Sequence, residues 1–266
     1  MEVRIEGSFE TLSQEEWDKY LGTELFKEMR FKEGTLGESR DFMKSISAPK
    51  LHEIIQEHNN KVGALEITYA LCRHYFDKGI PDNPWHISPG KNGQSIQYFP
   101  NFSEEHWMRK YWFNYFADTF YLKMSAAWDS IIEIIDSFYQ YEIQQDLRFR
   151  SNVFKKLKDD NPDLLALFNE IQENPLYTDA QKYRTAAAHG TSAGEVSNTV
   201  REQRNVETEI LEMVDGKPVM KKVKARQVVS FGAGEYTNVA TIMKNIEDYS
   251  KYSGTKMQEA IKLMET

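Results

Sequence analysis

The residues best suited to acid–base chemistry at neutral pH are an arginine and a histidine in the segment Arg184-Thr185-Ala186-Ala187-Ala188-His189. Histidine titrates near neutrality, and arginine carries a permanent charge on a planar group that fits a phosphate. Such a pair could remove the proton of a ribose 2′-hydroxyl and stabilise the charge that develops on the phosphate oxygens. Cleavage of RNA by this route needs no metal ion and leaves a 2′,3′-cyclic phosphate and a 5′-hydroxyl.

The spacing of this pair matters because both residues are expected on one short helix. Five residues of an ideal helix rotate by about 140°, so the two side chains converge only if the helix ends or distorts near His189. Gly190 stands where a left-handed helix end is usual, which favours such an ending. The alternative is structural: Arg184 makes a surface ion pair, and His189 stabilises the helix C-terminus.

Other segments that resemble chemical motifs are better explained by structure. His52-Glu53-Ile54-Ile55-Gln56 has glutamine where a zinc protease has its second histidine, and Phe231-Gly232-Ala233-Gly234-Glu235 has no third glycine for a phosphate loop. Cys72 lies in an apolar helical run, so we expect a buried, inert thiol. We therefore expect no metal and no cofactor.

Composition limits the class of protein. The 266 residues include 33 Lys and Arg against 41 Asp and Glu, so the net charge of −8 argues against general adhesion to nucleic acid. The single cysteine excludes an intrachain disulfide. The first thirty residues have no secretory signal, and no run of 18 apolar residues occurs, so we expect a cytoplasmic protein without a membrane anchor.

Apolar periodicity and capping residues predict a mostly helical chain. A long helix of roughly forty residues starts after Ser103, and its apolar stripe advances in steps of three and four. The stripe consists of Phe113, Ala117, Phe120, Met124, Ala127, Ile131, Ile134 and Phe138. Before it we expect a helix after the Ser13 and Glu16 capping box up to Phe31, a helix over 50–75, and an irregular segment over 78–102.

Shorter elements follow the long helix. Asn161-Pro162 starts a helix that Asn174-Pro175 ends, and Thr178 is the expected cap of the next one, over 179–189. The remaining expectations are a helix from Ser192 to Arg204, strands over 206–214 and 219–230 around an Asp215-Gly216 turn, and a final helix from Tyr236 with a break at Gly254.

A long helix, a second helix after Asn161, and a short helix that ends in Arg-x4-His resemble the HEPN (higher eukaryotes and prokaryotes nucleotide-binding) superfamily over about residues 103–205. The resemblance implies an all-α helical bundle. We expect an N-terminal helical section with a long loop over 1–102. The bundle itself is expected over 103–266 with a small inserted β-hairpin at about 206–230, and the two parts could form one continuous domain.

The resemblance also implies a function. Many members are metal-independent ribonucleases of toxin, antiphage or RNA-processing systems, and two subunits commonly pair so that both motifs line one cleft. Carried over, Arg184 and His189 are the catalytic pair, and the partners are RNA or a nucleotide, a second copy and a cognate antitoxin. A polar residue of the long helix often supports the motif; the candidates are Lys123 and Asp129, with Thr185 beside the arginine.

Two other functions remain open. Many members have a tyrosine two residues after the histidine, where this chain has Thr191, and this difference favours a non-catalytic module that binds a nucleotide or a protein and dimerises. A helical scaffold in which Arg184 and His189 are structural is the third possibility.

Basic residues provide candidate RNA contacts on this acidic chain. They are Arg148 and Arg150 after the long helix, and Lys221, Lys222 and Lys224 on the second expected strand. The alternative for the lysines is protection of an exposed sheet edge.

Overall fold

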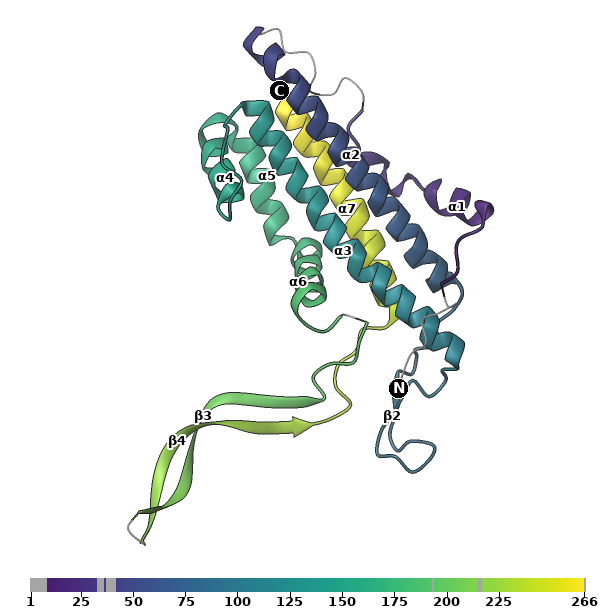
Figure 1. The fold of residues 1–266 in the computed structure, drawn as a ribbon, viewed down its shortest axis with the longest axis vertical. Coiled ribbons are helices and arrows are strands. Elements are labelled where there is room, and N and C mark those ends of the chain that lie inside the picture. Colours follow the sequence, from purple (N-terminus) through teal and green to yellow (C-terminus); the bar gives the residue numbers. More distant parts are fainter. Residues whose placement is uncertain (1–8, 33–35, 37–41, 193, 215–216, 266) are drawn as a thin grey trace.

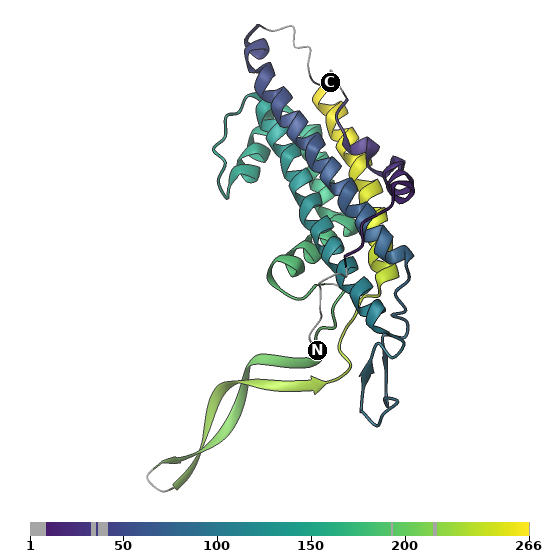
Figure 2. The ribbon, with the colours of Figure 1, turned by 45° about the vertical axis from the view of Figure 1, so that its right-hand side comes forward.

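The computed structural model describes residues 9–32, 36, 42–192, 194–214 and 217–265. Three long helices form the body: α2 (Phe42–Asp77), α3 (Glu104–Tyr139) and α7 (Val239–Glu265). They lie side by side, with α2 running opposite to α3 and α7 (Figures 1 and 2). None of the described helices is both long enough and apolar enough to cross a membrane. The expectation of an all-α bundle with a hairpin is confirmed.

The apolar stripe of α3 forms the centre of the core. Its residues from Phe113 to Ile134 are buried, and Phe138 packs against the core from the rim. Cys72 of α2 is also fully buried as expected, and burial raises the pKa of its thiol. The largest cluster of core residues runs from Phe26 to Met264, so residues on both sides of the 78–102 segment share one core.

Three shorter helices pack beside this trio: α4 (Phe149–Asp160), α5 (Pro162–Glu173) and α6 (Pro175–His189). The side chain of Asn161 accepts the backbone N–H of Leu164 at 2.9 Å, which confirms the expected start of α5. The cap of α6 is Asn174, which accepts the N–H of Leu176 at 2.9 Å, so the expectation of Thr178 was wrong. Proline after asparagine starts both helices, because proline lacks only an N–H that a first turn leaves unpaired.

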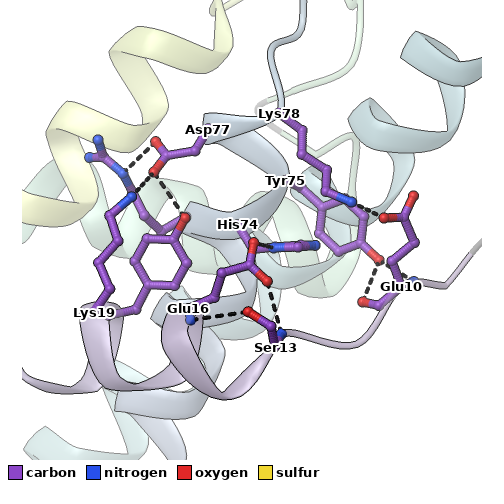
Figure 3. Close-up of polar contacts among 10 residues, drawn as sticks. Glu10, Ser13, Glu16, Lys19, His74, Tyr75, Asp77 and Lys78 are labelled. Atoms are coloured by element: carbon purple, nitrogen blue, oxygen red, sulfur yellow. Dashed lines mark hydrogen bonds and ion pairs between the residues drawn. The ribbon is translucent and has the colours of Figure 1, made fainter.

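The N-terminal segment lies along the end of α2 (Figure 3). Ser13 and Glu16 form the expected capping box of α1 (Gln14–Leu21), and Gly22 ends that helix earlier than expected. A 3-10 turn, η1 (Glu24–Met29), follows. The ring Nδ1 of buried His74 donates to the Glu16 carboxylate at 2.9 Å, so the capping residue also attaches α1 to α2.

Segment 78–102 holds two strands of two residues each, β1 (His86–Ile87) and β2 (Gln97–Tyr98). Its buried Asp82 accepts the Tyr236 hydroxyl at 2.5 Å and the backbone N–H of Val239 at 2.8 Å. A carboxylate is favourable there because the first N–H groups of a helix are unpaired and its N-terminus is positive. The segment thus fixes the start of α7.

A long antiparallel hairpin, β3 (Val200–Val214) and β4 (Lys217–Phe231), protrudes from the body (Figures 1 and 2). Both strands are longer than expected, and the expected Asp215-Gly216 turn lies outside the described residues. The expected helix from Ser192 to Arg204 was wrong. Ser192 and Glu195 bind side chains of α3 in place of helix N–H groups, and the chain is already paired with β4 from Val200.

Helix α7 continues through Gly254, so the expected break was wrong. A Cβ at Gly254 would lie 3.2 Å from the Cβ of Glu28, which shows that η1 packs closely on α7 there. Gly254 therefore permits the close packing of η1 on α7 and does not end the helix.

His58 lies at the centre of the packing between α2, α3 and η1. It is fully buried, with Nε2 2.8 Å from the carbonyl oxygen of Met29 and Nδ1 2.7 Å from the Ser130 hydroxyl. A neutral ring donates its Nε2–H to the Met29 carbonyl, and the Ser130 hydroxyl beside Nδ1 donates to the Ala127 carbonyl at 2.8 Å. Burial disfavours the charged ring and lowers the pKa of His58 from 6.5 to about 4.

This shift predicts a loss of stability in mild acid. Well above pH 6.5, His58 is neutral in both the folded and the unfolded protein. Between pH 6.5 and pH 4 the imidazole of the unfolded protein binds a proton and that of the folded protein does not, so protonation favours unfolding. We expect His58 alone to lower the free energy of unfolding by about 2 kcal/mol between pH 7.5 and pH 5. Urea unfolding at both pH values measures it, and His58→Gln should lose less stability over that interval. Equal losses in the two proteins would contradict the assignment.

Candidate functional site

The expected Arg184 and His189 lie in the last two turns of α6, and both side chains are exposed. Neither has a hydrogen-bond or ion-pair partner within the described part of the chain. Helix α6 stays regular to His189, and the N–H of Gly190 bonds the Ala186 carbonyl at 2.8 Å. Gly190 has φ −144°, so the expected left-handed ending was wrong. On one copy of α6, the two side chains therefore point about 140° apart.

A shallow, open groove of about 550 Å³ follows the outer face of α6 and includes His189 but not Arg184. The hydroxyl of Thr185, on this face, donates to the Gln181 carbonyl at 2.8 Å, and Lys182 pairs with Asp179 at 2.7 Å. The groove is lined by Thr178, Gln181, Lys182, Thr185, Ala186, His189 and Gly190.

Aromatic contacts fix the direction of α6 along α3. Tyr177, near the start of α6, meets Trp128 with ring centroids 6.2 Å apart, and Tyr183 stacks on Tyr121 at 5.0 Å. Later residues of α6 thus meet earlier residues of α3, and the two helices run in opposite directions. The end of α6 that carries His189 therefore lies toward the first half of α3.

The chain after His189 is anchored to that half of α3. The Ser192 hydroxyl donates to the Asp118 carboxylate at 2.8 Å, and burial raises the pKa of Asp118. One turn earlier, Asn114 donates to the Gly194 carbonyl at 3.1 Å and to the Glu195 carboxylate at 2.8 Å. A Cβ at Gly194 would overlap with the side-chain amide of Asn114, so glycine allows the chain to approach α3 this closely.

Lys110 completes this anchor from inside the protein. Its side chain is almost fully buried; its amine donates to the Gly194 carbonyl, lies 3.2 Å from the Glu195 carboxylate, and faces the rings of Phe99 and Tyr236. Burial lowers the pKa of Lys110, and the Glu195 carboxylate opposes that shift. We call Lys110, Asn114 and Asp118, with the Ser192, Gly194 and Glu195 that they hold, the α3 anchor.

The two candidates on α3 lie further along the helix than this anchor. Lys123 is half-buried and Asp129 is exposed, and neither has a polar partner in the described ranges. Asp118 is the acidic side chain that the structure connects to the end of α6, and the sequence reasoning missed it. The available signal was its position as an acidic residue within the apolar run from Phe113 to Ala127.

The basic candidates are dispersed. Arg148 is exposed before α4, whereas Arg150 donates to the Tyr177 hydroxyl at 3.0 Å and lies over the Phe154 ring. The three hairpin lysines each have a glutamate nearby. Lys221 pairs with Glu212 at 2.9 Å, and the register places Lys222 opposite Glu209 and Lys224 opposite Glu207.

Among the described residues, no three His, Cys, Asp or Glu side chains lie close enough to hold a metal ion.

Comparison with known families identifies one matching family. The model of the HEPN_Cthe2314-like HEPN family matches residues 55–253, from within α2 to within α7. The match is wider than the region of sequence resemblance and includes both α6 and the hairpin. No curated protein and no solved structure matches the chain. Since the family model covers well over half of the sequence, the chain belongs to the HEPN family.

Proposed function

We propose that the protein is a metal-independent endoribonuclease of the HEPN type, with Arg184 and His189 as its catalytic residues. The observation that carries the proposal is the Arg-x4-His pair, exposed and without polar partners in the described structure, at the end of α6 in a HEPN chain. An ion-paired arginine or a capping histidine would have supported the structural alternative; Arg184 has no ion pair among the described residues.

The chemistry uses the two side chains for different steps. Neutral His189 takes the proton of a ribose 2′-hydroxyl, and the 2′-oxygen attacks the adjacent phosphorus. The bond to the 5′-oxygen breaks, and that oxygen takes a proton from a second, protonated histidine. Arg184 stabilises the charge on the phosphate oxygens through its planar pair of donors. The products are a 2′,3′-cyclic phosphate and a 5′-hydroxyl.

This mechanism needs two copies of the chain. On one α6, Arg184 and His189 diverge by about 140°, so one copy cannot place both on the same phosphate. Two α6 helices related by a two-fold axis bring the arginine of one copy near the histidine of the other, and they also supply the second histidine as acid. The absence of bulky side chains at Ala186, Ala187 and Ala188 favours close approach of a second helix.

The α3 anchor has a positioning role in this proposal. It holds the chain three residues beyond His189, and so it fixes where α6 ends. A catalytic side chain at the last residue of a helix otherwise moves with the fraying of the last turn.

A non-catalytic module that binds a nucleotide or a partner protein is the second candidate. Thr191, in place of the tyrosine of many family members, favours it. In either case the proposed partners are RNA or a nucleotide, a second copy, and a cognate protein of antitoxin type.

The first prediction concerns the catalytic pair. In EDTA, the wild-type protein should cleave total bacterial RNA, and mapped ends should carry cyclic phosphates. Arg184→Ala and His189→Ala should each lower the rate by roughly 100-fold or more, because each removes a proton-transfer or charge-stabilising group. His52→Ala is a matched control, since His52 is exposed on α2 far from the motif in sequence. If all four proteins leave RNA intact, the binding module becomes the better account.

The second prediction concerns Asp118. Asp118→Ala removes the acceptor for Ser192 and should lower the maximal cleavage rate roughly 10- to 100-fold, because displaced catalytic groups lose that much. Asp118→Asn keeps an acceptor oxygen and should restore most of the rate. Asp129→Ala, an exposed site on the same helix, should have no effect. Equal rates for Asp118→Ala and Asp129→Ala would remove Asp118 from the site.

A further inference from the structure

The strands of the β3 and β4 hairpin extend away from the body, which bonds the chain only beside their base, where the Tyr98 hydroxyl donates to the Ala233 carbonyl at 3.1 Å in the described structure. Each strand has 15 residues, so the hairpin reaches about 50 Å at 3.3 Å per residue. Within the described ranges, neither strand contacts any other helix or strand (Figures 1 and 2). A two-stranded hairpin alone is only marginally stable in water. A partner surface would supply the missing stabilisation.

One face of the hairpin has charged residues along its middle and apolar residues at its tip. Because side chains alternate between the two faces of a strand and opposite residues share a face, the register defines its members. We call it the Leu211 face, formed by Glu207, Glu209, Leu211 and Met213 of β3 and by Pro218, Met220, Lys222 and Lys224 of β4. Its apolar tip is strongly exposed: Leu211 by 65%, Met213 by 64% and Met220 by 56%.

Charge is segregated between the two strands of this face. Glu207 and Glu209 lie on β3, and they are opposite Lys224 and Lys222 of β4. The face therefore has no net charge, which gives it little attraction for a phosphate backbone. The Leu211 face instead suits a partner that places lysines over its acids, acids over its lysines and apolar side chains over its tip.

A second copy of the same face has that pattern. A two-fold axis parallel to the strands places β3 of one copy over β4 of the other. The acids then face lysines, and Leu211 and Met213 face the apolar end of β4. A two-fold axis perpendicular to the strands would reverse their direction and place β3 over β3, so that Glu207 and Glu209 would lie over the apolar Met213 and Leu211 of the other copy. The charge order thus selects one symmetric arrangement.

We propose that the hairpin is a dimerisation arm whose Leu211 face packs on the Leu211 face of a second copy, with the two arms parallel. Four residues from each strand are fewer than the roughly 20–30 per partner of a standard interface. The arm contact therefore adds to a contact between the helical bodies. The inference shares with the proposed function only the need for two copies, and its test measures assembly and not cleavage.

The test exchanges the charges of one strand at a time in the full-length chain. Glu207→Lys with Glu209→Lys makes the whole face basic, and Lys222→Glu with Lys224→Glu makes it acidic. By sedimentation velocity, each variant alone should dimerise at least roughly tenfold more weakly than the wild type, because like charges oppose each other. An equimolar mixture should recover wild-type dimerisation, and native mass spectrometry with a tag on one variant should show mostly mixed dimers.

The mixture separates this result from damage to the hairpin, because each chain in it keeps like charges on its own two strands. Two further variants serve as controls. The variant with all four substitutions restores opposite charges within and between copies, and it should dimerise like the wild type. Glu212→Lys on the opposite face should not change the dimer, although it breaks the ion pair with Lys221. Helical content by circular dichroism should be the same in every variant.

Three outcomes would overturn the inference. They are a wild-type protein that stays monomeric at tens of micromolar, basic and acidic variants that dimerise like the wild type, and a mixture that forms mixed dimers only at the statistical ratio. If the variants dimerise normally but lose retention of RNA, the arm binds RNA and not a second copy.

Discussion

The packing of α2 against α3 is the contact on which the other elements depend. Both helices have 36 residues, and both bury apolar side chains along most of their length. Helices α1, α4, α6 and α7 and the turn η1 each contact one or both of them. The buried His58 joins α2, η1 and α3 at one point, so a polar group specifies how these elements meet. Displacement of α3 would therefore move the helix surface against which α6 and the candidate site pack.

The candidate site is built on this frame by two kinds of contact. Ring stacking between Tyr121 and Tyr183 sets the direction of α6, and the α3 anchor fixes the chain beyond its last residue. This leaves Arg184 and His189 on the surface, held by their helix and free of other polar partners among the described residues. Because α6 is regular, its geometry separates the two side chains, and the same geometry makes a second copy necessary for the proposed chemistry.

Local patterns predicted much of the fold. The apolar stripe of α3, the Asn161 cap and the Ser13 capping box all depend on neighbours within one helix, and each is present. The errors came from residues whose partners are distant in sequence. Ser192 has the local pattern of a helix cap, but its hydroxyl binds Asp118, 74 residues away. Gly254 looked like a break but allows η1 to approach α7. The partner of Asp118 could not be predicted for the same reason, although its place among apolar residues was a signal that the acid is buried.

The central claim is that Arg184 of one copy acts with His189 of another. The direct measurement is RNA cleavage by a mixed dimer of Arg184→Ala and His189→Ala chains, purified through a different tag on each. Each variant paired with itself lacks one of the two groups, whereas the mixed dimer keeps one arginine and one histidine, on different copies. The mixed dimer lacks the second histidine, so water must protonate the leaving 5′-oxygen in its place. We predict that the mixed dimer recovers a small part of the wild-type activity while the two unmixed variants remain inactive. An active wild type with an inactive mixed dimer would contradict the account.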